Sequence, residues 1–347
     1  MPMIIGGVDT HAATHHAVIL DEIGQSQGSE SFPATPAGYT QMLRWMQRHG
    51  TIRAVGVEGC GAYGAGLARH LHGQSITVIE VPRPDRRLRR NRGKSDPIDA
   101  EAAARAVLSG TATVQPKLTD GPIESMRALR IARLGAVKAK TATTNALKAM
   151  VITAPEALRA QLTGLTTVQL VNACSRFRPD LAELGDPTQA TKIAMRSIAI
   201  RARNLIDESR TLKRQLDTLT RQVAPTTTAV FAIGPETAAA LLITIGDNPD
   251  RLRSEASFAH LCGVAPIPAS SGKTNRHRLH RGGDRSGNRA LHLAIIVRLR
   301  YCERTHAYVT RRTSEGKTMP EIIRCLKRYL AREIFNAIRT DYAALMT

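Results

Sequence analysis

The sequence predicts a mixed α/β domain, followed by a helical segment and a mostly helical C-terminal domain. Strand-like apolar runs alternate with helix-like stretches in the first third of the chain. Strand signals then disappear, and apolar residues recur in a heptad pattern. After a proline and a run of threonines at residues 225–228, the chain becomes basic and glycine-containing. We therefore expect three segments: residues 1–112, 113–224 and 225–347.

The first segment opens with three short strands, after which helices and strands alternate. The strands are expected at residues 4–8, 17–20, 29–32, 54–57 and 76–81, and the helices at residues 36–48, at 63–72 and from Pro97. This order is typical of a ribonuclease-H-like fold, in which helices cover a mixed sheet.

The second segment contains a seam of apolar residues with a period of seven. Its members are Ile198, Leu205, Leu212 and Leu219, with Ala202, Ser209, Leu216 and Val223 four residues after each. Four heptads predict a coiled coil. Because Ala202 and Ser209 weaken the seam, both a dimer stalk and a helical hairpin within one chain stay open, and we prefer the dimer.

The third segment begins with a tight turn at residues 233–235 that leads into an apolar helix. This pattern is found in helix-hairpin-helix modules, where backbone N–H groups at the helix start hold a phosphate. An ordinary capped core helix explains so short a match equally well.

The chain is strongly basic, with 49 lysines and arginines against 29 acidic residues and a net charge of +20. This excess predicts a polyanionic partner, although total charge alone also suits a membrane-surface binder. The basic residues concentrate at 83–94 and 273–289, as expected of contacts to phosphates. The expected nucleic-acid ligands are Arg83, Arg86, Arg87, Arg89, Arg90, Arg92, Lys94, Lys273, Arg276, Arg278, Arg281 and Arg285.

Five scattered cysteines without metal-site spacing indicate reduced thiols. The N-terminus shows no signal segment, and the most apolar stretch, residues 229–245, is interrupted by Gly234, Pro235 and Glu236. We expect a cytoplasmic protein that does not enter a membrane.

Four acidic residues lie where the predicted elements can bring them together. Asp9 ends the first strand and Glu58 the fourth, while Asp96 and Asp99 begin the last helix of the segment, on one face of it. We expect Asp96 just before the helix and Pro97 at its first position. Four carboxylates can hold two Mg²⁺ ions, which activate the attacking oxygen and stabilise the leaving oxygen in phosphoryl transfer. Singly, each acid is better explained as a cap, a turn residue or a solvated charge, and only jointly do the four favour a metal site.

A serine motif lies in the basic part of the third segment. Ser270 and Ser271 precede Gly272 and Lys273, and arginines follow closely. A serine on an exposed turn among arginines can attack a phosphate group, although Ser-Ser-Gly alone is most often only a loop.

Together these motifs resemble the DEDD-type bacterial insertion-sequence transposases, which are bridge-RNA-guided recombinases. The RuvC-like domain of that family is matched by Gly7-Val8-Asp9, Val57-Glu58 and the six residues 95–100. Its transposase domain is matched by residues 263–266, 270–273 and Gly287-Asn288. After this Gly-Asn, the family's usual Leu-Arg pair is replaced by Arg289-Ala290, so Arg289 receives no catalytic role.

The resemblance implies that Asp9, Glu58, Asp96 and Asp99 bind Mg²⁺, and that Ser271, or its neighbour Ser270, forms a transient covalent link to DNA. It further implies donor and target DNA as substrates, a noncoding bridge RNA as guide, a homo-oligomer (dimer or tetramer) and a place at the bacterial nucleoid.

Three other functions compete with this one. A metal-dependent nuclease or junction resolvase would use the same carboxylates to activate water, and a non-catalytic nucleic-acid-binding protein would use none of them. An actin-like sugar kinase also begins with Gly-x-Asp, but Glu58 and the pair Asp96 and Asp99 fit a nuclease site better.

Overall fold

The computed structural model describes residues 1–82, 95–248, 251, 253–272 and 277–345. The chain forms two compact units, each assembled from separate segments of the sequence. Unit 1 consists of Met1–Glu124, Leu241–Arg289 and Thr318–Phe335, and unit 2 of Ser125–Ala240, Ala290–Lys317 and Asn336–Thr347.

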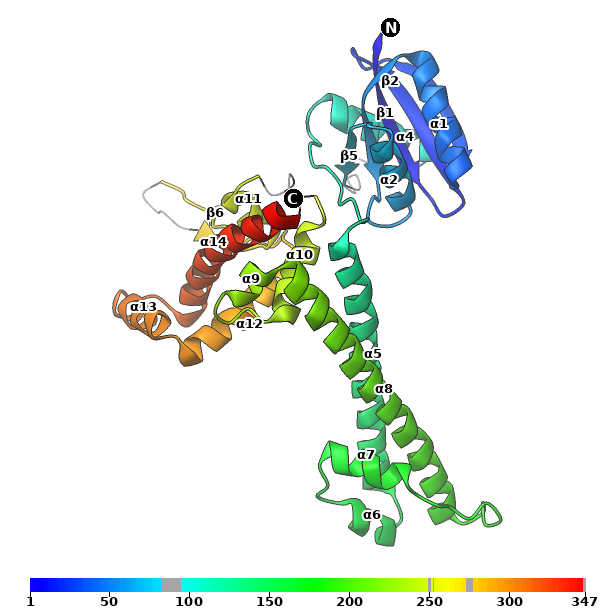
Figure 1. Cartoon of the computed structure of the whole chain (residues 1–347), viewed down its shortest axis with the longest axis vertical. Coiled ribbons are helices and arrows are strands. Elements are labelled where there is room, and N and C mark those ends of the chain that lie inside the picture. The colour runs from blue at the N-terminus through cyan, green and yellow to red at the C-terminus, as the bar shows by residue number, and fades with distance from the viewer. Residues whose placement is uncertain (83–94, 249–250, 252, 273–276, 346–347) are drawn as a thin grey trace. The chain divides into compact units, whose positions relative to one another are not determined.

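The N-terminal part of unit 1 is built on a five-stranded mixed sheet (Figure 1). Its strands are β1 (Met3–Thr10), β2 (Thr14–Asp21), β3 (Ser26–Pro33), β4 (Thr51–Glu58) and β5 (Val78–Val81). They lie in the order β3-β2-β1-β4-β5, with β1, β2 and β3 antiparallel and with β4 parallel to both β1 and β5. All five predicted strands are confirmed, and so is the mixed character of the sheet.

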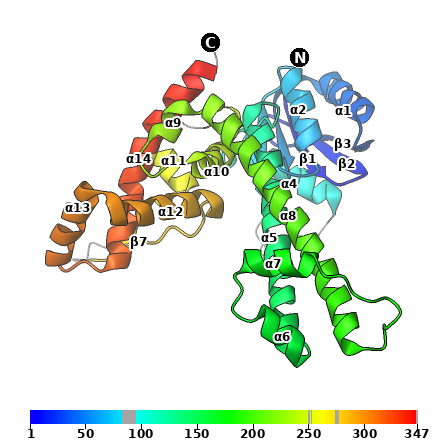
Figure 2. The ribbon, with the colours of Figure 1, turned by 60° about the horizontal axis from the view of Figure 1, so that its bottom comes forward.

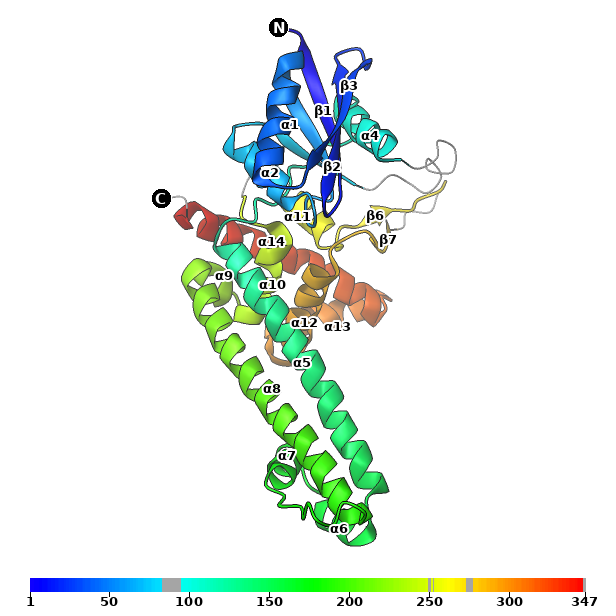
Figure 3. The same ribbon diagram turned by 90° about the vertical axis from the view of Figure 1, so that its right-hand side faces the viewer.

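Helices cover both faces of this sheet. Helices α1 (Pro36–His49) and α2 (Ala65–Gly73) pack on one face, and α4 (Asp96–Leu108) packs on the other (Figure 3). The alternation along β1 explains the division, because successive side chains of a strand point to opposite faces. Val8 joins the core beneath α1 and α2, whereas Ile5 packs against Ala100 and Ala104 of α4.

Helix α4 lies very close to the sheet because glycine and alanine face one another. A Cβ atom added to Gly7 of β1 would stand 2.1 Å from the carbonyl oxygen of Ala100 and 2.3 Å from the amide nitrogen of Ala104. Only a residue without a side chain allows this approach. The backbone of α4 is therefore held directly against β1 at Gly7.

Unit 2 contains a long helical hairpin. Its helices are α5 (Pro122–Thr153), α6 (Glu156–Leu162), α7 (Thr167–Ser175) and α8 (Pro187–Val223). Helices α5 and α8 run side by side, and α6 and α7 lie at the end where the hairpin turns (Figure 2). The core at that end includes Leu147, Leu158, Leu170 and Met195.

The predicted heptad seam lies on α8. Ala202, Ser209, Leu216 and Val223 are buried, and Ile198, Leu205, Leu212 and Leu219 are half-buried. Ala202 joins the core of the hairpin turn together with residues of α5, α6 and α7. Packing within the chain therefore uses this part of the seam, as in the hairpin alternative.

The remaining described elements are mostly helical, as predicted. They are α9 (Pro225–Ala229), α10 (Pro235–Ile245), α11 (Glu255–Leu261), β6 (Ile267–Pro268), β7 (His277–Arg278), α12 (Arg285–Tyr301), α13 (Glu303–Ser314) and α14 (Met319–Leu345). In the first turn of α10, Glu236 forms ion pairs with Arg133 at 2.8 Å and with Arg130 at 3.2 Å. Residues 238–242 of this helix are buried, which favours the core-helix interpretation.

Two further predictions concern thiols and membranes. All five cysteines are free thiols, as expected. Within the described residues, none of the helices is both long and apolar enough to cross a membrane.

The contact between Gly7 and α4 predicts a sharp effect of one methyl group. Gly7→Ala should lower the free energy of unfolding by about 1–3 kcal/mol, because the added Cβ overlaps backbone atoms that cannot move independently. Gly73→Ala is the matched control, since a Cβ there meets nothing within 4 Å, and it should be neutral or slightly stabilising. Urea unfolding followed by circular dichroism measures both, and equal stability of the two variants would contradict the close packing.

Candidate active site

Two predicted carboxylates end neighbouring strands at one edge of the sheet. Asp9 lies near the end of β1 and Glu58 ends β4, and the pairing of Val8 with Val57 in the parallel register places them in corresponding positions. The Thr10 hydroxyl donates a hydrogen bond to the backbone oxygen of Glu58 at 2.8 Å, which ties the two strand ends together. Asp9 and Glu58 are only 7% and 8% exposed. The sheet therefore holds two acidic side chains largely away from solvent.

The start of α4 supplies the other two predicted acids. Ser95 has the extended backbone of an N-cap residue, and the helix begins at Asp96 with Pro97 in its first turn. The expectation that Asp96 precedes the helix was therefore wrong by one position, because Ser95 takes that place. Asp99 is 5% exposed, whereas the Asp96 side chain is 52% exposed. The two acids share a helical face but differ in depth.

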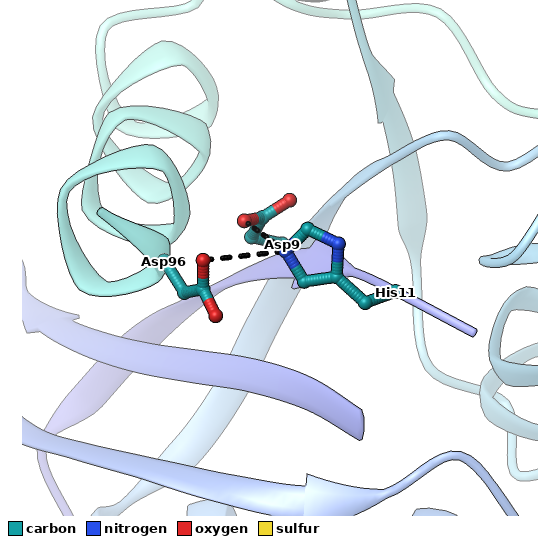
Figure 4. A group of neighbouring side chains, drawn as sticks. All are labelled: Asp9, His11 and Asp96. Carbon is teal, nitrogen blue, oxygen red and sulfur yellow. Dashed lines mark hydrogen bonds and ion pairs between the residues drawn. The ribbon is translucent and has the colours of Figure 1, made fainter. Parts of the chain in front are cut away.

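His11 connects Asp9 to Asp96 (Figure 4). Its Nε2 atom lies 3.2 Å from Oδ2 of Asp9 and 3.3 Å from Oδ1 of Asp96. Sequence reasoning missed this residue. The available signal was the Asp-x-His spacing, because side chains two residues apart in an extended chain point to the same side.

The electrostatics of the site disfavour its negative charge. Burial raises the pKa of Asp9 above its ordinary value, and repulsion from Asp99 and Asp96 raises it further, against an opposing attraction from His11. The pKa of Asp9 is raised overall, so the attraction from His11 is smaller than the combined effects of burial and repulsion. A bound cation would stabilise the ionised carboxylate against both effects.

The donor atoms suit a divalent metal ion. The ligand atoms of Asp9, His11 and Asp96 all lie within 4.8 Å of one another. Carboxylate oxygens are the ligands that Mg²⁺ and Mn²⁺ prefer, and imidazole nitrogen binds transition metals. Asp9, His11 and Asp96 therefore fit a divalent metal ion, whereas this group does not include Glu58 and Asp99.

The predicted serines lie on a different element. Strands β6 and β7 pair as a short antiparallel hairpin, with Ile267 opposite Arg278, and Ser270 and Ser271 follow β6. Both serines are exposed.

The base of this hairpin is fixed by a network of hydrogen bonds. The Asn288 amide donates to the backbone oxygens of Cys262 and Gly263 at 2.9 Å and 3.1 Å. Lys327, which is 8% exposed, donates to Asn288 at 3.0 Å. Gly283 packs so tightly that a Cβ there would lie 2.1 Å from the amide nitrogen of Gly263. The motif residues Gly263 and Asn288 thus have a structural role next to the hairpin.

The predicted nucleic-acid ligands are only partly visible. Arg278, Arg281 and Arg285 are exposed to solvent, as phosphate contacts require. The others lie outside the described residues: Arg83, Arg86, Arg87, Arg89, Arg90, Arg92, Lys94, Lys273 and Arg276.

The raised pKa of Asp9 predicts the effect of removing its charge. A carboxyl whose pKa is raised on folding stabilises the fold below that pKa and loses this contribution as the pH rises through it. At pH 7 in EDTA, Asp9→Asn should therefore melt at a higher temperature than the natural protein, and the difference should shrink towards pH 4. The control is Asp207→Asn, an exposed acid on α8 that should change little. A lower melting temperature for Asp9→Asn would show that His11 already compensates the charge.

Two family models match segments of this chain. Residues 6–154 match a family model of IS110-type DEDD transposases, described as "Transposase". Residues 227–310 match a second model, "Transposase IS116/IS110/IS902 family".

One curated relative is the insertion element IS110 uncharacterized 43.6 kDa protein of Streptomyces coelicolor, which is 30% identical over 156 residues. The matched segment covers 44% of this chain and 38% of that relative. The two family models match in chain order and together cover more than half of the sequence. Over these two segments the chain is similar to transposases of the IS110 family.

Proposed function

We propose that this protein is an insertion-sequence transposase that cuts and rejoins DNA strands with a metal site and a serine nucleophile. The observation that carries the proposal is the group of acidic residues around Asp9, in a chain similar to transposases of the IS110 family. Such a cluster is electrostatically unfavourable until it binds cations, and cations bound there can act on a phosphodiester. The burial of Asp9, Glu58 and Asp99, and the repulsion of Asp9 by Asp99 and Asp96, argue against independent caps or surface charges.

Within this proposal, two Mg²⁺ ions are held by the four acids Asp9, Glu58, Asp96 and Asp99. The ions supply charge stabilisation for phosphoryl transfer when bound. The chain positions the ligands, because β1 and β4 fix Asp9 and Glu58 while the packing of α4 on Gly7 fixes Asp99. The domain around them, residues 1–112, would be RuvC-like.

Ser271 is the proposed nucleophile, with Ser270 as the alternative. The serine hydroxyl would lose its proton as its oxygen bonds to the scissile phosphorus, and the DNA sugar oxygen would leave and take up a proton. Attack on the serine-phosphate link by the sugar hydroxyl of a new DNA end would then rejoin the strands and return the proton to the serine. Its exposure on a hairpin with a fixed base supports this role, since DNA can reach it. Arg278, Arg281 and Arg285 are exposed cations that can contact the phosphates.

The proposed binding partners are inferred from the net positive charge of the chain and from its similarity to IS110 transposases. A net charge of +20 suits DNA and RNA backbones. We propose donor and target DNA as substrates, a noncoding bridge RNA as guide and a homo-oligomer as the working form. In the homo-oligomer, residues 113–224 would act as a coiled-coil segment and residues 225–347 as the serine-bearing transposase domain.

A covalent adduct tests the serine mechanism against water attack. Purified protein is mixed with Mg²⁺, RNA transcribed from its element's flanks and labelled element-end DNA, and adducts are resolved on a denaturing gel. The natural protein should form an adduct that Ser271→Ala and Asp9→Ala each reduce by at least about 100-fold. Ser270→Ala and the exposed-helix control Ser197→Ala should retain it.

The remaining outcomes separate the alternatives. Cleavage without an adduct, insensitive to both serine changes, would identify a water-activating nuclease. Loss of the adduct in Ser270→Ala alone would show that Ser270, and not Ser271, is the nucleophile. Binding of DNA without cleavage or adduct in any condition would favour a non-catalytic nucleic-acid-binding protein.

A further inference from the structure

We infer that His11 is a ligand of the metal ion and that its nitrogen makes the site bind a transition metal such as Mn²⁺ more tightly than Mg²⁺. This inference rests on the proposed metal site and adds a residue outside its four carboxylates. His11 lies directly after β1, where the chain turns towards β2.

The distances around His11 fit metal ligands, although Nε2 also lies within hydrogen-bond distance of Asp96. One nitrogen, Nε2, faces oxygens of Asp9 and Asp96 at 3.2 Å and 3.3 Å. Charge-assisted hydrogen bonds are shorter, at about 2.7–2.9 Å, and one N–H group cannot align well with two acceptors at once. Neighbouring ligand atoms around a six-coordinate ion with bonds near 2.1 Å stand about 3 Å apart. Nε2 therefore stands at the spacing of adjacent corners of one coordination sphere from each of the two oxygens, and all three ligand atoms lie within 4.8 Å of one another.

The backbone holds each of these three residues independently of a metal. The His11 amide donates to the Thr14 backbone oxygen at 3.1 Å, which closes the turn between β1 and β2. Asp9 is fixed by the sheet, and Asp96 by the start of α4. The His11 side chain is 46% exposed, so one side of the group stays open to solvent or substrate.

Two other histidines near Asp9 are engaged elsewhere. His16 is opposite Asp9 in the β1–β2 register, but its ring contacts the hydroxyls of Ser29 at 2.7 Å and Ser31 at 2.8 Å. His15 is fully buried and stacks on Tyr39 at 5.6 Å. His11 is thus the imidazole that faces the carboxylates.

A nitrogen ligand changes which metal the site prefers. Mg²⁺ binds almost entirely through oxygen, whereas first-row transition ions accept imidazole readily. An all-carboxylate site would bind both classes through oxygen alone. A site with His11 should bind Mn²⁺ more tightly than Mg²⁺, and the difference should depend on this side chain.

Electron paramagnetic resonance of Mn²⁺ tests the inference without measuring catalysis. Untagged full-length protein is titrated with Mn²⁺, with and without competing Mg²⁺, and pulsed spectra are examined for coupling to imidazole ¹⁴N. The variants are His11→Gln, His16→Gln as the matched control and Asp9→Asn, each checked for folding by circular dichroism. The natural protein and His16→Gln should show nitrogen coupling, and His11→Gln should lose it. The preference for Mn²⁺ over Mg²⁺ should fall by on the order of tenfold in His11→Gln.

The outcomes distinguish this inference from the proposed function. Mn²⁺ bound in an Asp9-dependent manner without nitrogen coupling would overturn the role of His11 and leave the carboxylate site standing. Nitrogen coupling that is lost in His16→Gln but kept in His11→Gln would show that His16, and not His11, binds the metal, which would overturn the inference. Absence of Asp9-dependent Mn²⁺ binding would overturn the metal site itself, and the inference with it.

Discussion

The packing of one helix on one strand determines the geometry of the whole site. At Gly7 the backbone of α4 approaches β1 so closely that a single methyl group would overlap it. Ala100 and Ala104 present the small surface that makes this approach possible. Because Asp99 precedes Ala100 on the same helix, this contact sets its distance from Asp9. The position of Asp99 relative to Asp9 therefore depends on Gly7, which has no side chain.

This arrangement has a cost in stability. Asp9, Glu58 and Asp99 are all less than a tenth exposed, and the pKa of Asp9 is raised by burial and by its acidic neighbours. Buried like charges weaken a fold unless something neutralises them. On the opposite face of the same strands, Val8 and Val57 are fully buried in an apolar core. Carboxyl groups whose pKa is raised by burial and by neighbouring acids are typical of functional sites.

Most of the sheet and its carboxylates could be predicted from the sequence. Short apolar runs bounded by turns define β1 to β5, and parallel pairing of β1 with β4 follows from the order of the elements. Asp9 and Glu58 come at strand ends that meet, so their proximity follows from topology alone. Asp99 could be placed by helical spacing once the start of α4 was known.

Other features depend on contacts that no periodic pattern reports. His11 follows β1 in a turn that is closed by a backbone hydrogen bond to Thr14, so only its Asp-x-His spacing could have indicated it. Unit 1 also joins distant segments through side chains that bind loop backbone: Asn248 donates to Pro116 at 2.9 Å, and Asp247 accepts from Ile123 at 2.9 Å. Residues 113–124 therefore pack with residues after 240, although the composition of the sequence places them in different predicted segments.

The most direct test of this account is anomalous diffraction from crystals of the full chain grown with Mn²⁺. The account predicts a peak at bonding distance from carboxylate oxygens of both Asp9 and Asp96. Ordered Mn²⁺ found only elsewhere, with the carboxylates around Asp9 still free of metal, would contradict it.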